Sequence, residues 1–83
     1  MSQKTNNGPK NLTRLLKNKV VLITGGAGSI GTSLTKKLLE YPIQSLRVLD
    51  IDEYGLFKLG RVINDKRLRL LLGSIIEIGR AHV

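Results

Sequence analysis

Apolar residues gather along this chain in blocks that alternate between two kinds of spacing. The block at 20–23 is an unbroken aliphatic run, rich in β-branched residues, and two glycines follow it closely. Such a run is typical of a strand that is buried on both faces of a sheet. The blocks at 46–49 and 68–72 have a similar composition and predict a second and a third strand.

The segments between these strands carry apolar residues at helical spacing. In the first segment Ile30, Leu34 and Leu38 form the stripe, and Pro42 ends the predicted helix of about three turns. The stripe of the second segment consists of Leu56, Leu59, Val62 and Ile63. The resulting order, β-α-β-α-β, predicts an α/β fold with a parallel sheet and right-handed crossovers.

The start of the chain departs from this pattern. Residues 1–11 are polar after the initial methionine, and they predict a flexible tail within a basic segment, 1–18. Leu12, Leu15 and Leu16 then predict one amphipathic turn that docks on the domain that follows. A membrane-surface anchor is the alternative for this turn, which is short for that role.

The length and composition of the chain exclude several classes of protein. The chain has 83 residues, fewer than the ~100–200 of a usual domain, so we expect one small core or part of a larger one. With no cysteine and a single histidine, His82, it cannot form a disulfide framework or a Cys/His zinc site. It contains neither a run of ~20 apolar residues nor a secretory signal, so we expect a cytoplasmic protein without a membrane span.

The net charge of +8 makes a nucleic-acid binding module a rival interpretation. The basic residues are, however, spread over the tail, both predicted helices and the third strand. Phe57 and the two tyrosines form no stripe on which bases would stack. We therefore expect no nucleic-acid partner.

Three glycines, Gly25, Gly28 and Gly31, lie between the first predicted strand and the first helix. The first permits a sharp turn, the second lets the backbone approach a pyrophosphate, and the third lets the helix pack closely on the sheet. The N–H groups of Ser29 and Ile30 would then point at the phosphates, where the helix dipole favours negative charge. This strand-turn-helix context predicts the N-terminal part of a Rossmann NAD(P)-binding domain, at 19–76.

Asp50 ends the second strand, nineteen positions after Gly31. An acid about 20 residues after the glycines binds the adenosine ribose hydroxyls in such domains. Because a carboxylate repels a 2′-phosphate, NAD is favoured over NADP as cofactor, although Arg47 and Arg61 leave NADP open.

Two other interpretations of these residues remain. The glycines could serve turn geometry alone, with Asp50 capping the next helix through its neighbour Asp52. Gly26 and Gly31 also have the G-x-x-x-x-G spacing of a P-loop, but Thr32 stands where that motif requires lysine.

The stretches 21–31, 47–56 and 69–75 together resemble extended short-chain dehydrogenases/reductases. Within these, the chain is most similar to the polysaccharide-biosynthesis (CapD-like) group of nucleotide-sugar 4,6-dehydratases and epimerases. The resemblance covers about 12–76, which is only the first part of such a domain.

This resemblance implies an NAD(P)-dependent enzyme of polysaccharide biosynthesis that acts on a nucleotide sugar and forms a homo-oligomer. The nicotinamide would take a hydride from C4 of the sugar and later return it. Ser74 and Ile75 would contact the cofactor, although members usually carry aspartate at the position of Ser74, against the adenine. Another extended short-chain dehydrogenase/reductase, or a dinucleotide-binding domain without catalysis, is the alternative.

The catalytic Tyr-x-x-x-Lys pair of this family lies well downstream of the segment matched here, so we expect no catalytic residue in this chain. Tyr54 and Lys58 have the same spacing, but they fall on the helix after the second strand, where a surface i,i+4 pair is expected.

Residues 77–83 are interpreted as an adapter-derived tail, because one frame of a common sequencing adapter, ATCGGAAGAGCACACGTC, translates to the last six residues. A truncated sheet of order 3-2-1 would leave the first strand as an unpaired apolar edge. We therefore expect the isolated chain to fold poorly or to aggregate, and to bind cofactor weakly.

Overall fold

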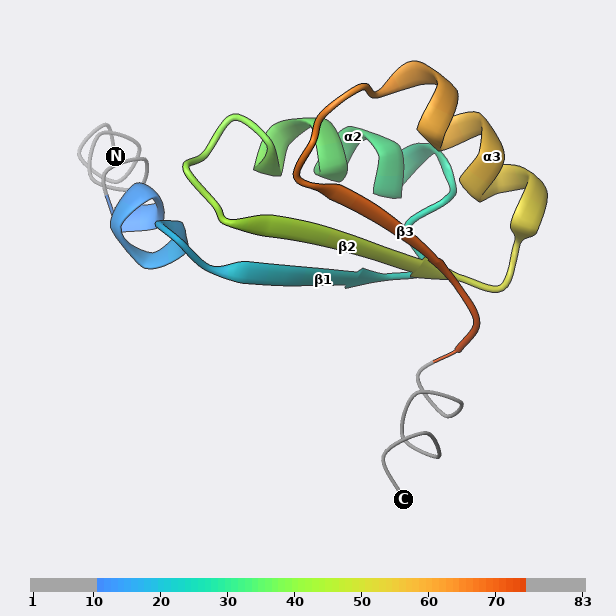
Figure 1. Ribbon diagram of the computed structural model, residues 1–83, viewed down its shortest axis with the longest axis horizontal. Coiled ribbons are helices and arrows are strands. Elements are labelled where there is room, and N and C mark those ends of the chain that lie inside the picture. The colour runs from blue at the N-terminus through green and yellow to red at the C-terminus, as the bar shows by residue number, and fades with distance from the viewer. Residues whose placement is uncertain (1–10, 75–83) are drawn as a thin grey trace, which may run out of the picture.

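Strands and helices alternate in the computed structural model, which describes residues 11–74 (Figure 1). A helical segment at 11–16 comes first. The elements that follow are β1 (Val20–Thr24), α2 (Ser29–Leu38), β2 (Ser45–Asp50), α3 (Glu53–Val62) and β3 (Leu68–Leu72). The predicted order of elements is confirmed. The predictions for residues 1–10, for Ile75 and for 77–83 lie outside the described residues.

The strands form a parallel sheet in the order β1-β2-β3, so the predicted order with β1 at an edge is confirmed for the described residues. The register places Ile23, Val48 and Leu70 side by side across it. Both helices lie on the same face of the sheet (Figure 1), because two right-handed crossovers in the same direction return the chain over one face.

The core lies between this face and the helices. Leu46 and Val48 of the central strand are completely buried, since they have a strand on either side and helices above. The other buried members of the cluster are Ile23, Ile43, Leu56 and Leu59.

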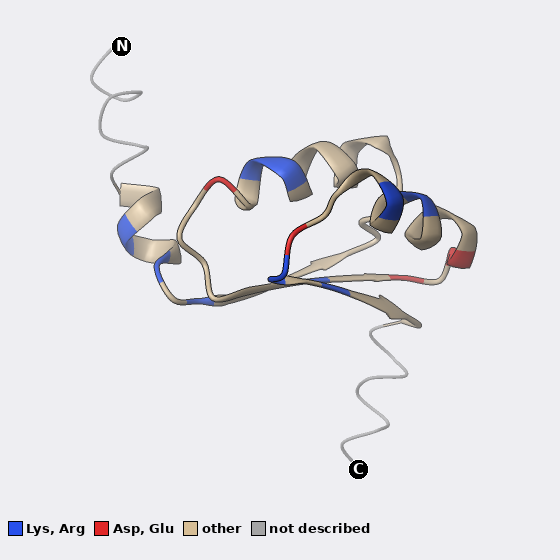
Figure 2. Cartoon of the chain, turned by 45° about the horizontal axis from the view of Figure 1, so that its top comes forward, with Lys and Arg blue, Asp and Glu red and all other residues tan. Residues whose placement is uncertain are grey.

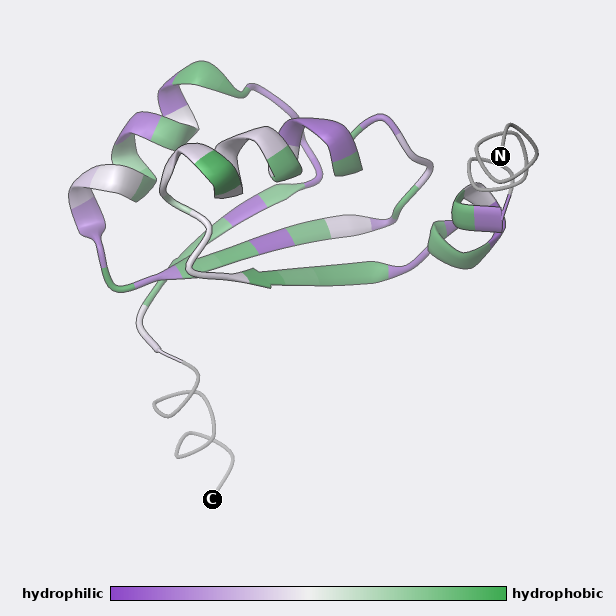
Figure 3. Ribbon diagram, turned by 180° about the vertical axis from the view of Figure 1, so that it is seen from behind, coloured by the Kyte–Doolittle hydropathy of each residue, from purple (hydrophilic) through white to green (hydrophobic). Residues whose placement is uncertain are grey.

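β1 is less buried than its sequence predicts. Val20 and Leu22 are 49% and 44% exposed, whereas Ile23, on the helix-covered face, is 8% exposed. The expectation of burial on both faces is wrong for the described residues, since no described element covers the far face. In Figure 3 the green ribbon of β1 marks this apolar strand along one edge of the sheet.

The apolar stripe of α2 reaches the core only at its C-terminal end, where Leu38 packs against the buried cluster. Ile30 is 84% exposed and Leu34 is 45% exposed, whereas Gly31 and Thr35 are buried. The Thr35 hydroxyl donates to the Gly31 carbonyl oxygen at 2.8 Å, which satisfies this buried polar group within the helix. The small residues face the sheet because the first turn of α2 approaches the glycine loop closely.

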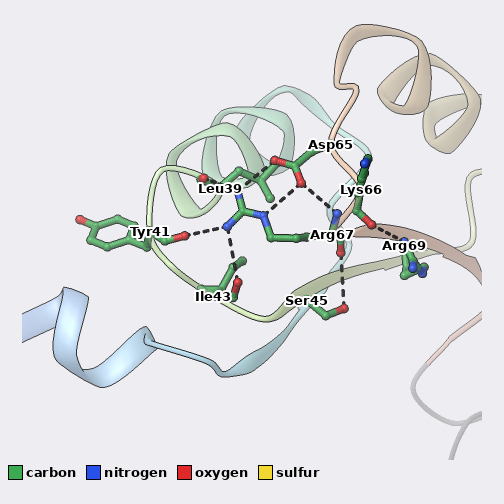
Figure 4. Close-up of polar contacts among 8 residues, drawn as sticks. All are labelled: Leu39, Tyr41, Ile43, Ser45, Asp65, Lys66, Arg67 and Arg69. Carbon is green, nitrogen blue, oxygen red and sulfur yellow. Dashed lines mark hydrogen bonds and ion pairs between the residues drawn. The ribbon is translucent and has the colours of Figure 1, made fainter.

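Arg67 holds together the edge of the sheet at which the strands begin (Figure 4). Its guanidinium donates to the Leu39 carbonyl oxygen at 2.6 Å and to that of Tyr41 at 2.8 Å. Asp65 accepts from the same guanidinium at 2.9 Å. One half-buried side chain thus joins the start of β3 to the loop between α2 and β2.

The helical segment at 11–16 contacts this same end of the domain. Leu16 packs against the core, whereas Leu12 and Leu15 are exposed. The chain then turns at Asn18, which has a φ of 60° and donates its N–H to the Pro42 carbonyl oxygen at 2.9 Å. Within residues 11–74, none of the helices has the length and apolar character needed to cross a bilayer.

Candidate dinucleotide site

The strands end together at one edge of the sheet, on the right of Figure 1, and a shallow cavity of about 200 Å³ lies there. It is lined by the residues that end the strands or follow them: Thr24, Gly25, Leu49, Asp50, Ile51, Gly73 and Ser74. Ligands of open α/β sheets bind in the crevice outside the carboxyl ends of the strands. Gly25, Asp50 and Ser74, which the sequence singled out, therefore share one cavity in the expected place.

The glycine loop from β1 to α2 adopts the turn that its composition predicts. Gly25 has a φ of +67°, a conformation that side chains disfavour, and its N–H donates to the Leu49 carbonyl oxygen at 2.7 Å. A Cβ on Gly31 would overlap the backbone of Gly26, so this position requires glycine for the helix to pack. A Cβ on Gly28 would meet no atom within 4 Å, which leaves space for a ligand above the loop.

The N-terminus of α2 is open to an anion. Gly28 is the N-cap and supplies no side-chain acceptor for the first-turn N–H groups. Ser29 and Ile30 are exposed there, and the first turn holds no acidic residue. Unsatisfied N–H groups and the positive end of the helix dipole favour a phosphate at such a terminus. The residues present therefore fit the pyrophosphate of a dinucleotide.

Asp50 faces the glycine loop from the end of β2. One of its carboxylate oxygens accepts from the Ala27 N–H at 2.9 Å, and the other accepts from the Asp52 N–H at 3.0 Å. The hydrogen bond from Ala27 is the main cause, and that from Asp52 the second, of a lowered pKa for this carboxyl. Asp50 is therefore ionised at neutral pH and carries the charge expected of a ribose acceptor.

Asp50 is not the cap of the next helix. That role belongs to Asp52, whose carboxylate accepts from the Gly55 N–H at 3.0 Å and so satisfies the first turn of α3. The two carboxylates thus have separate partners, one in the glycine loop and one in α3.

Arg47 and Arg61, the two arginines whose presence left NADP open as a cofactor, do not line the cavity beside Asp50. Arg47 pairs in register with Leu22, so it lies on the face of the sheet opposite to Ile23 and Val48. The Arg61 guanidinium lies 5.6 Å from the centre of the Phe57 ring on α3. Among the described residues, the lining of this cavity contains no cation that would receive a 2′-phosphate.

Tyr54 and Lys58 form the surface pair that their spacing predicts. The Lys58 ammonium lies 4.9 Å from the centre of the Tyr54 ring, and that ring is 67% exposed. Neither residue lines the cavity at the strand ends. Tyr54 lies on the outer surface of α3, whereas Lys58 also lines the groove between the two helices, with Gly28 and Ser29.

Gly55, in the first turn of α3, had no predicted role. A Cβ at this position would come within 2.8 Å of the Ala27 Cβ and 2.7 Å of an Asp52 carboxylate oxygen. Glycine inside a helix is unfavourable, and this was the signal that could have marked the position as one of close approach.

The family model described as "Polysaccharide biosynthesis protein" matches residues 21–81. The chain is 38% identical over 71 residues to an uncharacterized membrane protein of Methanocaldococcus jannaschii, a match that covers 86% of this chain and 21% of that protein. It is 35% identical over 66 residues to the UDP-N-acetylglucosamine 4,6-dehydratase (inverting) of Campylobacter jejuni subsp. jejuni serotype O:23/36, covering 78% of this chain and 20% of the enzyme. The chain thus spans about a fifth of the length of these curated relatives.

A solved structure of the Bordetella bronchiseptica enzyme WbmF in complex with NAD+ superposes with a TM-score of 0.60 at 27% identity. The superposition covers 81% of this chain and 20% of WbmF. A second WbmF structure, which matches equally well, contains NAD+ and UDP. The family match over 21–81, together with the shared arrangement of parallel strands and helices, shows that this chain belongs to the polysaccharide biosynthesis proteins, within the extended short-chain dehydrogenases/reductases.

Proposed function

We propose that this chain forms the part of an NAD-dependent nucleotide-sugar 4,6-dehydratase that binds the ADP half of the cofactor. The observation that carries the proposal is the meeting of the glycine loop, the uncapped N-terminus of α2 and the ionised Asp50 at the carboxyl ends of parallel strands. Phosphate and ribose are the two groups that these features recognise.

Each half of this arrangement has a separate task. The open space above Gly28 admits the pyrophosphate, and the N–H groups of Ser29 and Ile30 donate to it. Asp50 accepts from the ribose hydroxyls, and Ile51 and Ser74 line the cavity beside it, where the adenine is proposed to lie. Bound NAD would supply a hydride acceptor for the sugar, and the chain's described residues supply binding and orientation.

NAD is preferred to NADP in this proposal because Asp50 and Asp52 bring two carboxylates to the end of β2. A 2′-phosphate placed there would be repelled, and the described lining of the cavity offers no arginine to offset the repulsion. The WbmF complex with NAD+ is consistent with this preference.

A nucleotide sugar is the proposed substrate class, supported by the dehydratase among the relatives and by UDP in a WbmF complex. Dehydration is proposed ahead of epimerisation because the Campylobacter relative is a dehydratase. Nucleic-acid binding is not favoured, since the Lys and Arg positions of the described residues are spread over several helices and strands in Figure 2.

Equilibrium dialysis of the 83-residue chain with NAD and with NADP tests the proposal. We expect NAD to bind about tenfold or more tightly than NADP, because one repulsive contact of about 1.4 kcal/mol gives that ratio. The substitution Gly28→Val should abolish NAD binding without changing the circular dichroism spectrum, since its Cβ meets no protein atom within 4 Å. Lys66→Ala, at the opposite edge of the sheet, is the control and should bind normally. Equal binding of NAD by the Gly28→Val variant would refute the proposed site.

A further inference from the structure

We propose that Asp50 and Gly55 are positioning residues that clamp the glycine loop at Ala27, so that the loop is held in its phosphate-binding shape before any nucleotide arrives. This inference rests on the proposed function and deepens it. It assigns a task to Asp50 that is separate from contact with a ribose, and it assigns a task to a helical glycine that the sequence pattern leaves unexplained.

The first half of the clamp is the hydrogen bond that the Ala27 N–H donates to the Asp50 carboxylate at 2.9 Å. The other carboxylate oxygen accepts from the Asp52 N–H at 3.0 Å. A single charged side chain therefore ties the loop after β1 to the loop after β2. Hydrogen bonds to an ionised acceptor are stronger than neutral ones, so this tie restrains both loops.

The second half of the clamp is steric. The space where a Cβ of Gly55 would lie is 2.8 Å from the Ala27 Cβ, so only glycine lets α3 approach the loop this closely. Ala27 is thereby bounded by α3 on one side and held by Asp50 on the other. Ala27, Gly28 and Gly55 also line one common groove between the two helices, which places the contact directly beside the phosphate-binding positions.

A loop that is already ordered loses less conformational entropy when it binds, and the affinity for every ligand of that loop benefits. Loss of the clamp should therefore weaken all nucleotides that use the loop. Loss of a ribose contact alone should weaken only nucleotides that carry ribose hydroxyls. These two consequences separate the clamp from the ribose contact.

The experiment compares ADP with 2′,3′-dideoxy-ADP on the 83-residue chain, and it follows hydrogen exchange at the Ala27 amide by mass spectrometry without ligand. For Asp50→Ala we expect exchange at Ala27 to quicken about tenfold and the affinity for 2′,3′-dideoxy-ADP to fall about tenfold, the effect of losing one charge-assisted hydrogen bond. The affinity for ADP should fall further, because ADP also loses its ribose contact with Asp50. For Gly55→Ala we expect changes in the same direction.

Two matched controls isolate the clamp. Glu53→Ala removes the same charge three residues from Asp50 without touching Ala27, and Gly60→Ala introduces the same methyl group into α3 against the flexible end of Leu70. Both should leave exchange at Ala27 and the affinity for dideoxy-ADP unchanged.

Asp50→Ala overturns the inference if it weakens ADP alone and leaves exchange at Ala27 as it was. Failure of the unmodified chain to bind either nucleotide would instead contradict the proposed function. The exchange rate at Ala27 needs no ligand, so it decides the clamp in that case as well.

Discussion

The guanidinium of Arg67 donates to two carbonyl oxygens at the end of α2 and in the loop that follows it, and the Tyr41 oxygen also accepts from the Ile43 N–H at 2.8 Å. Its bonds to Leu39 and Tyr41 are 2.6 and 2.8 Å long, and they close the edge of the sheet opposite to the candidate site. We expect Arg67→Ala to lower the free energy of unfolding by about 2–3 kcal/mol, as the loss of charge-assisted bonds to carbonyl groups does. Urea unfolding followed by circular dichroism measures this, with Lys66→Ala as the neighbouring control. A loss no larger than that of the control would show that the contacts in Figure 4 contribute little.

Asp65, the partner of Arg67, makes the stability of the fold depend on pH in the acid range. The hydrogen bonds and charge of Arg67 lower the pKa of Asp65 from 3.8 to about 2. Because the pKa is lower in the folded chain, the stabilisation is complete above pH 3.8 and is lost as the pH falls towards 2. We expect Asp65→Asn to lower the free energy of unfolding at pH 7. We also expect this free energy to fall less steeply in the variant as the pH drops from 3.8 towards 2. Urea midpoints from pH 7 to 2 would show it, and an unchanged acid limb in the variant would contradict the assignment.

At the scale of elements, two like charges lie at paired positions of neighbouring strands. Arg47 of β2 and Arg69 of β3 are partners in register on the far face of the sheet, and both are exposed. Like charges in this relation destabilise a sheet, so Arg47→Thr should stabilise the chain by about 0.2–1 kcal/mol at low ionic strength. The gain should shrink in high salt because the repulsion is screened. Urea midpoints at two salt concentrations test this, and a gain independent of salt would point to strand propensity instead.

The elements and the glycine loop could be predicted because each depends on local sequence. The aliphatic run of β1, the turn glycines and the acid that ends β2 determine local structure or lie at fixed intervals from each other. Burial could not be predicted as well, since a periodic pattern shows that a helix has an apolar stripe and not which element will cover it. Ile30 is therefore exposed although its spacing is that of a core residue.

Contacts between segments far apart in the sequence could not be predicted either. The bond from Ala27 to Asp50 joins residues 23 positions apart, and that from Arg67 to Leu39 joins residues 28 apart. No short-range sequence pattern predicts either of these hydrogen bonds. Gly55 gave a weak signal as a helical glycine, but its neighbour Ala27 becomes evident only once α3 lies against the loop.

At the scale of the whole molecule, β1 is the exposed feature with the clearest consequence. It pairs only with β2 among the described strands, its sequence VVLIT has no charge, and Leu22 is 44% exposed on the far face. An uncharged, unpaired strand edge is a template for association with another chain. We therefore expect the 83-residue chain to associate as its concentration rises, despite a net charge of +8.

A glutamate at position 22 tests this expectation with little cost to the fold. Arg47 is the register partner of Leu22, so Leu22→Glu adds charge to the edge and also gains an ion pair across the strands. Two such edges brought together would place like charges in contact, so the concentration at which association begins should rise about tenfold or more. Sedimentation velocity across a dilution series measures it. Leu15→Glu, which makes the same charge change at a leucine 65% exposed outside the sheet, is the matched control. If both variants raised the threshold equally, net charge would be the cause, whereas a rise confined to Leu22→Glu would identify the β1 edge as the surface through which chains associate.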